Sequence, residues 1–231
     1  MKAIVNCAIG DTYLVLQERL ILRCQEHCPD VKHLFFDDYP EGCPPHAERQ
    51  YAFKIYALRA AIAAGADEVI WMDCTFQPRA DIERLWQHIE SVGWYVQKQG
   101  DATLAEWCCD SALEIFGVTR TQALDIPMVL SGLVGLDLKS RVGAQIWDKW
   151  QRSYEAGAFD GPHLNIPGEE HAEWGNKFSG HCSDDPVVNG HRHDEAALSW
   201  VVWSMGLDLP TATEFTTIER AAEVAFIERN F

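Results

Sequence analysis

The apolar residues of this chain fall into short uninterrupted runs that alternate with longer amphipathic stretches. In the first hundred residues this pattern predicts three strands, each followed by a helix. The strands span residues 2–8, 31–36 and 68–72, and the helices span residues 13–28, 47–64 and 79–92. Asp11 or Thr12 can cap the first helix. Because strands alternate with helices, we expect an α/β fold with a mostly parallel central sheet flanked by helices.

The second half of the chain is less regular. It predicts strands and helices at wider spacing, and then an irregular stretch that is rich in Gly, Pro, His and acidic residues. The strands span 94–97 and 128–138, the helices lie within 104–116 and over 141–155, and the irregular stretch spans 158–192. Loops of this length in compact domains commonly serve as lids or binding loops. We therefore expect one domain over 1–231, with a nucleotide-binding half (1–100) and an acceptor or catalytic half (101–231).

Composition narrows the class of protein. The net charge of −16 argues against a nucleic-acid partner, which calls for a basic surface. The start of the chain lacks a secretory pattern, and no stretch reaches the roughly 18 apolar residues of a membrane span. The eight cysteines include no Cys-x-x-Cys pair, so we expect reduced thiols in a cytoplasmic protein. Cys24 and Cys28 lie on an apolar helix, where packing is the expected role.

Asp73 follows the buried strand over 68–72 and precedes Pro78. In open α/β sheets, ligands bind outside the carboxyl ends of the strands, so Asp73 is placed where chemistry is common. The alternative is that Asp73 caps the following turn. Asp37, at the end of the preceding predicted strand, is a second acidic group at this edge, and it is suited either to hydrogen-bond a base or ribose or to form the turn.

The order of motifs resembles that of glycosyltransferases with the GT-A fold. In that family an Asp-x-Asp motif follows the strand that Trp71-Met72-Asp73-Cys74-Thr75 resembles, and it binds a divalent metal and the donor diphosphate. The helix over 51–58 resembles the helix before that strand, and residues 131–137, which include Ser131 and Gly132, resemble the segment that meets acceptor and sugar. Residues 193–199 resemble the His-Asp-Glu motif of retaining galactosyltransferases related to the blood-group enzymes, and the Asp-Gln-x-x-Leu motif of glycogenin-like enzymes.

One position departs from the family pattern, because Thr75 stands where the second metal-binding aspartate is expected. A hydroxyl removes one negative charge from the site, and divalent cations prefer charged oxygen ligands. Three interpretations stay open: a weaker Mn²⁺ or Mg²⁺ site completed elsewhere, a metal-independent enzyme, or an inactive binding protein. His193 is the favoured extra metal ligand, and Lys54 and Arg49 are candidates for the diphosphate if metal is absent, although each suits a solvated helix charge.

Asp194 and Glu195 begin a predicted helix, where acidic groups also answer the helix dipole. The resemblance gives Glu195 the role of nucleophile or transition-state stabiliser and Asp194 that of holding a sugar hydroxyl.

We therefore interpret the sequence as that of a glycosyltransferase, either a hexosyl- or a pentosyltransferase, that uses a nucleoside-diphosphate sugar such as a UDP-sugar. The motif resemblance implies a retaining mechanism. The acceptor is open among glycan, lipid, protein and modified base. A non-catalytic nucleotide-sugar-binding protein is the alternative. A sugar nucleotidyltransferase is less favoured, because residues 8–12 do not form its Gly-x-Gly-x-Arg-Leu loop.

Overall fold

The computed structural model describes residues 1–166, 172–174, 177–209, 215–217 and 227–229. Its centre is a five-stranded sheet in the order β2-β1-β3-β6-β5. These strands are β1 (Lys2–Cys7), β2 (Lys32–Phe36), β3 (Glu68–Met72), β5 (Trp94–Thr103) and β6 (Pro127–Asp137). β1 pairs in parallel with both β2 and β3, whereas β6 runs antiparallel to β3 and β5. The mostly parallel α/β sheet predicted from the sequence is confirmed.

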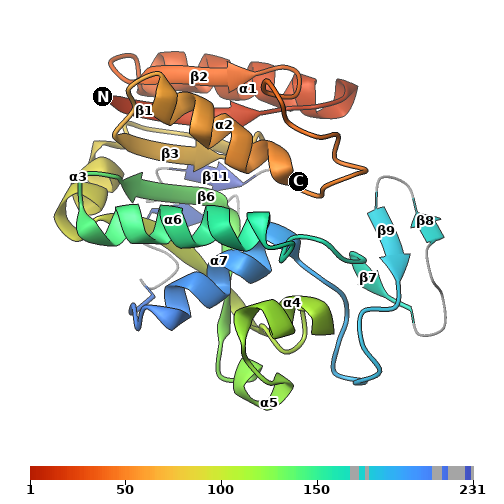
Figure 1. The fold of residues 1–231 in the computed structure, drawn as a ribbon. Helices are drawn as coiled ribbons and strands as arrows, with labels where there is room; N and C mark the ends of the chain where they lie inside the picture. The colour runs from red at the N-terminus through yellow and green to blue at the C-terminus, as the bar shows by residue number, and fades with distance from the viewer. Residues whose placement is uncertain (167–171, 175–176, 210–214, 218–226, 230–231) are drawn as a thin grey trace.

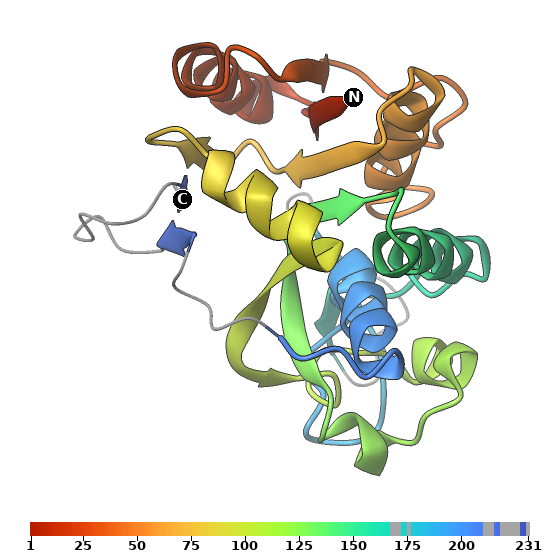
Figure 2. The same cartoon turned by 90° about the vertical axis from the view of Figure 1, so that its left-hand side faces the viewer.

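Helices cover both faces of this sheet, as Figure 1 and Figure 2 show. One face carries α2 (Ala52–Ala63), α6 (Arg141–Glu155) and α7 (His193–Ser204), and the other carries α1 (Asp11–His27) and α3 (Glu83–Val92). The two short helices are α4 (Asp110–Phe116) and α5 (Arg120–Ala123).

Alternation along the strands divides the core into two layers. In β3, Val69 and Trp71 pack into the core under α2, α6 and α7, whereas Ile70 and Met72 pack into the core under α1 and α3. Successive side chains of a strand point to opposite faces, so an unbroken apolar run is what a strand covered on both sides requires. Cys24 and Cys28 are buried in the second layer, and every cysteine is free, as expected.

Several boundaries differ from the sequence prediction. The helix expected from residue 47 begins at Ala52, because Tyr51 has a left-handed backbone with φ 56°. The helix expected from residue 79 begins at Glu83, after the short strand β4 (Phe76–Pro78). Gly10 is the N-cap of α1 and no side chain caps it, so the predicted cap by Asp11 or Thr12 is wrong.

The irregular stretch over 158–192 contains more structure than the sequence indicates. Its described residues include β7 (Leu164–Asn165), β8 (Ala172–Trp174) and β9 (Lys177–Gly180), which form a small sheet in the order β7-β9-β8. A third sheet joins β10 (Thr216–Thr217) and β11 (Ile227–Arg229) to β4. Among the described residues, no helix combines the length and apolar character needed to cross a membrane.

Candidate functional site

The carboxyl edge of the parallel strands carries the candidate site. Asp73 follows β3 directly, and its amide donates to the Gly132 carbonyl (2.8 Å), which extends the β3–β6 ladder by one bond. The Asp73 carboxylate accepts a hydrogen bond through Oδ1 from the Trp71 indole N–H (2.7 Å). Trp71 is fully buried, so this bond fixes the orientation of a carboxylate whose side chain is 30% exposed. Asp73 is therefore held rigidly at an accessible position.

Lys54 joins this strand end to α7. Its ammonium lies 2.8 Å from Asp194 Oδ2 and 3.4 Å from Asp73 Oδ1. It also donates to the hydroxyl (2.9 Å) and the carbonyl (3.2 Å) of Ser131. An ammonium has three N–H donors, so its donors are fully engaged within the chain. Lys54 is buried, not the solvated helix charge that the sequence offered as an alternative.

Electrostatics keeps Lys54 charged despite its burial. Burial by itself lowers the pKa of an ammonium, but the carboxylates of Asp194 and Asp73 outweigh it and hold the Lys54 pKa above its ordinary value. The Tyr51 and Trp71 rings add cation–π contacts at 5.5 and 5.6 Å. Removal of either partner of such a buried ion pair leaves the other charge unpaired, which destabilises the folded protein.

The first turn of α7 supplies the two acidic residues identified in the sequence. Asp194 is buried with 2% exposure, and its carbonyl accepts the Trp150 indole N–H (3.1 Å). Glu195 is half-buried. Burial first, and then the Asp194 carboxylate, raises the Glu195 pKa to about 7 against the opposing effects of Lys54 and Arg192. Glu195 therefore exchanges its proton close to neutral pH.

Gly132 leaves room beside the Asp73 carboxylate. A Cβ at this position would lie 3.0 Å from Asp73 Oδ2 and 2.5 Å from Phe76 Cε2. Among the described residues no hydrogen bond reaches Asp73 Oδ2. The absence of a side chain at Gly132 thus keeps the second carboxylate oxygen free of crowding. This is the close approach that glycine within a strand often marks.

Thr75 and His193 are the other two residues that the sequence predicts as metal ligands. Thr75 is half-buried, two residues beyond Asp73. The buried His193 ring has its Nδ1 2.8 Å from the Phe159 carbonyl, and burial holds its pKa well below the usual value. Over the described part of the chain, no group of three His, Cys, Asp or Glu side chains has metal-binding geometry. Asp73 with Thr75 offers two oxygen-bearing side chains, and further ligands have to come from substrate or water.

The remaining predicted residues lie around this centre. Arg49 contacts Asp160 (Nε to Oδ1, 3.0 Å) and donates to the Tyr154 carbonyl (2.7 Å), so its guanidinium ties the loop before α2 to the segment after α6. Asp37 is exposed at the end of β2. Because β2, β1 and β3 are parallel neighbours about 4.8 Å apart, Asp37 lies on the same edge as Asp73, one strand removed.

Tyr51 belongs to the candidate site, although no pattern in the sequence pointed to it. Tyr51 and His193 are the two non-glycine residues with positive φ in the described chain, at 56° and 46°. Their rings lie 5.2 Å apart, and Tyr51 also contacts Lys54. Such backbone strain costs about 1–3 kcal/mol per residue and clusters at functional sites. Its presence in two elements that meet beside Asp194 supports a site here.

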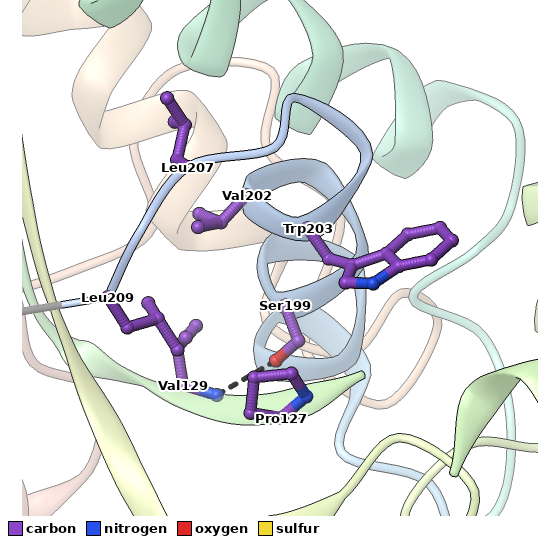
Figure 3. Close-up of a pocket in the computed structure, with 7 residues that line it drawn as sticks. All are labelled: Pro127, Val129, Ser199, Val202, Trp203, Leu207 and Leu209. Carbon is purple, nitrogen blue, oxygen red and sulfur yellow. Dashed lines mark hydrogen bonds between the residues drawn. The ribbon is translucent and has the colours of Figure 1, made fainter. Parts of the chain in front are cut away.

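A separate pocket lies at the far end of α7 (Figure 3). It is lined by apolar residues of β6, α7 and the segment after it, and in Figure 3 the Ser199 hydroxyl accepts the Val129 amide hydrogen. Trp203 also lines this pocket. A volume of about 40 Å³ is far below the roughly 300 Å³ of a small ligand pocket, so this is not a nucleotide-sugar site.

Comparison with known proteins places the fold. No family model matches the chain, and no curated protein does. A solved structure of the galactosyltransferase LgtC, in complex with donor and acceptor sugar analogues, matches with a TM-score of 0.53 and 9% identity over 100% of this chain and 87% of that one. Mouse xyloside xylosyltransferase 1 also matches, with a TM-score of 0.47 and 11% identity over 98% of this chain and 84% of that one.

At these identities the similarity indicates the fold alone. The LgtC structure matches over the whole of this chain. The sheet order and the helices on both faces agree with the fold that the motif resemblance implies. The chain has the GT-A fold of glycosyltransferases.

Proposed function

We propose that this protein is a glycosyltransferase that moves a sugar from a nucleoside-diphosphate donor to an acceptor. One observation carries the proposal. Lys54 connects Asp73, at the carboxyl end of β3, with Asp194, at the start of α7, by contacts of 3.4 and 2.8 Å. In an open α/β sheet this edge is where ligands bind. A buried, charge-balanced group at that edge is costly to maintain and has the rigidity that a preorganised site requires.

Charge at this edge favours a divalent cation as cofactor. Three carboxyl groups lie at this edge, those of Asp73, Asp194 and Glu195. The buried ammonium of Lys54 has its N–H donors occupied by contacts within the chain. A diphosphate brings further negative charge, and oriented cations are a common means of stabilising a leaving diphosphate. Asp73 Oδ2 and the Thr75 hydroxyl are the groups we assign to Mn²⁺ or Mg²⁺, which when bound would neutralise charge on the leaving group.

The protein's own side chains receive distinct roles in this proposal. Asp194, held by Lys54, accepts a hydrogen bond from a hydroxyl of the donor sugar. Glu195 faces the same region with a pKa near 7, so the ionised form becomes abundant above neutral pH. An ionised Glu195 attacks the sugar carbon as the diphosphate leaves, and the acceptor then displaces Glu195. Alternatively, Glu195 stabilises the positive charge on the sugar while the acceptor enters on the face that the diphosphate leaves. Each of these two routes retains the configuration, in keeping with the motif resemblance. Arg49, in the loop before α2, and Asp37, at the end of β2, border the donor.

A donor screen tests the proposal directly. Nucleoside-diphosphate sugars with different bases and sugars would be mixed with the protein with and without Mn²⁺, and thermal stability followed. A ligand that binds the native state at 100 times its Kd adds about 2.7 kcal/mol to apparent stability. Asp73→Asn should abolish the metal-dependent shift, whereas Asp148→Asn should keep it, because Asp148 pairs with Arg152 on the exposed side of α6. A screen in which no nucleotide sugar stabilises the protein would refute donor binding.

Turnover separates this proposal from the alternative of a non-catalytic nucleotide-sugar-binding protein. Thr75 favours the alternative, because the site has one metal-binding carboxylate where two are expected from the resemblance. Release of nucleoside diphosphate from the stabilising donor would be measured with glycan, lipid, peptide and nucleoside acceptors, and with water alone. Donor binding without release in any mixture supports the binding protein. Release that is lost in Asp194→Asn supports the transferase.

A further inference from the structure

Residues 158–163, which we term the clamped loop, lie against the start of α7. Side-chain groups face most of the backbone carbonyls of this loop. His191 Nε2 lies 3.0 Å from the Ala158 carbonyl, and His193 Nδ1 lies 2.8 Å from the Phe159 carbonyl. The carbonyls of Asp160 and Pro162 face thiols. Two imidazoles and two thiols thus lie within hydrogen-bond distance of four carbonyl oxygens in residues 158–162, where backbone amides are the usual donors.

The two thiols belong to Cys109 and Cys182. Cys109 Sγ donates to the Asp160 carbonyl (3.7 Å), and Cys182 Sγ donates to the Pro162 carbonyl (3.1 Å). Between these carbonyls lies Gly161, where an added Cβ would sit 3.1 Å from Cys109 Sγ. Both sulfur atoms therefore lie against the same short stretch of the clamped loop.

A backbone hydrogen bond places the segments that carry the two cysteines next to each other. The amide of Asp110 donates to the Cys182 carbonyl (3.1 Å), so residues 109–110 and 182 run side by side. Backbones joined in this way lie roughly 5 Å apart, and disulfides join Cα atoms roughly 4.4–6.8 Å apart. Burial, and after it the neighbouring Cys109, raises the pKa of Cys182 to about 12.

Cys109 is the reactive member of the pair. Burial raises the pKa of its thiol, but His191 and the Ser111 hydroxyl (3.3 Å) outweigh burial and bring that pKa to about 7. The thiolate is the form that reacts with peroxide. Cys109 is buried at 3% exposure, and the carbonyl that its sulfur contacts belongs to Asp160, whose side chain is 46% exposed. Opening of the clamped loop would therefore give peroxide access to Cys109.

We propose that Cys109 and Cys182 form a peroxide-driven, reversible disulfide that controls the clamped loop. In the first step the Cys109 thiolate attacks the O–O bond of a hydroperoxide, giving a sulfenic acid and a hydroxide or alkoxide. The Cys182 thiol then attacks the Cys109 sulfur, the S–S bond forms, and water leaves. The two thiols together lose two protons and two electrons, and the hydroperoxide accepts the two electrons as its O–O bond breaks.

Oxidation removes both S–H donors from the clamped loop at once. The loop carries Asp160, the ion-pair partner of Arg49, and Phe159, whose carbonyl holds the His193 ring. Both contacts border the site around Lys54 and Asp194. We expect the disulfide to disturb this border and to lower affinity for a nucleotide sugar, a consequence that rests on the proposed function. The disulfide itself does not depend on that function.

Peptide mapping tests the disulfide. The full-length protein would be treated with hydrogen peroxide, alkylated and digested with trypsin without reduction. Cleavage after lysine and arginine places Cys109 in peptide 99–120 and Cys182 in peptide 178–192. We expect these peptides to appear cross-linked, about 2 Da lighter than their sum, and to separate again in a thiol reductant.

Cys108→Ser is the matched control, because Cys108 is a buried neighbour in the same peptide. The cross-link should persist in Cys108→Ser and vanish in Cys109→Ser and Cys182→Ser, and Cys182→Ser should instead trap a sulfenic acid at Cys109. Persistence in Cys109→Ser would overturn the assignment, as would oxidation confined to the half-buried Cys43. Donor affinity that falls on oxidation in the wild type but not in Cys182→Ser supports control of the site. Cross-linking without that fall rejects the control and leaves the disulfide in place.

Discussion

Replacement of Lys54 by methionine tests the centre of the site. The ammonium lies 2.8 Å from Asp194, whose side chain is 2% exposed and has no other charged partner among the described residues. At an effective dielectric constant of 20, the gross attraction at this distance is roughly 6 kcal/mol. Loss of one member of a buried pair costs about 3–5 kcal/mol, because the other charge is left unpaired. For a chain of this length that corresponds to a fall in Tm of roughly 6–20 °C.

Chemical denaturation of Lys54→Met beside the wild type is the assay. Adding Asp194→Asn to Lys54→Met should recover most of the stability, since no isolated charge is left. Lys139→Met is the control, because Lys139 also pairs with two carboxylates but is 56% exposed, where pairs contribute about 0–1 kcal/mol. A cost below about 1 kcal/mol, or strictly additive losses in the double variant, would refute the reasoning.

Three further predictions concern residues beside this pair. In the wild type, the raised pKa of Glu195 favours the folded state at low pH, so this contribution to stability is lost as pH rises from about 4.5 to about 7. The Glu195→Gln variant should lack this dependence of unfolding free energy on pH. It should also transfer the sugar at least about a hundredfold more slowly, with donor affinity unchanged. Near-wild-type turnover would leave Glu195 as a helix-terminus charge. Gly132→Ala should destabilise the protein by about 1–3 kcal/mol and weaken donor binding, because its Cβ meets Phe76 and Asp73; unchanged melting and affinity would contradict the crowding. Thr75→Asp should tighten Mn²⁺ binding in calorimetry, because a carboxylate replaces a hydroxyl, and equal affinity would exclude Thr75 from the metal site.

The sequence by itself determined the order of the elements and the position of the acidic motifs. Apolar periodicity is a local property, so the runs that become β1, β2 and β3 can be identified without knowing what packs on them. The break after Met72 places Asp73 at a strand end, and the polar start of an otherwise apolar stretch places Asp194 and Glu195 at a helix start. Motif order added the GT-A resemblance, which the fold confirms.

The tertiary structure decided how these residues meet. Nothing local to Lys54 distinguishes a buried ammonium from a solvated one, because its burial depends on Ser131 in β6 and on Asp194 in α7. The helix α2 begins later than predicted for a similar reason, since Tyr51, with its left-handed backbone, contacts His46 nearby and His193 in α7. Helix boundaries predicted from propensity miss such contacts.

Pairing between distant segments accounts for the other differences. The short strands within 158–192 have little periodicity of their own, and β7 exists because it pairs with β9. The closeness of Cys109 and Cys182 has the same origin, because a backbone bond between α4 and the segment after β9 brings them together. A sequence specifies such neighbours only through the free energy of the whole packed chain. The residues of the candidate site can therefore be identified in the sequence, whereas the contacts among them are determined by the tertiary structure.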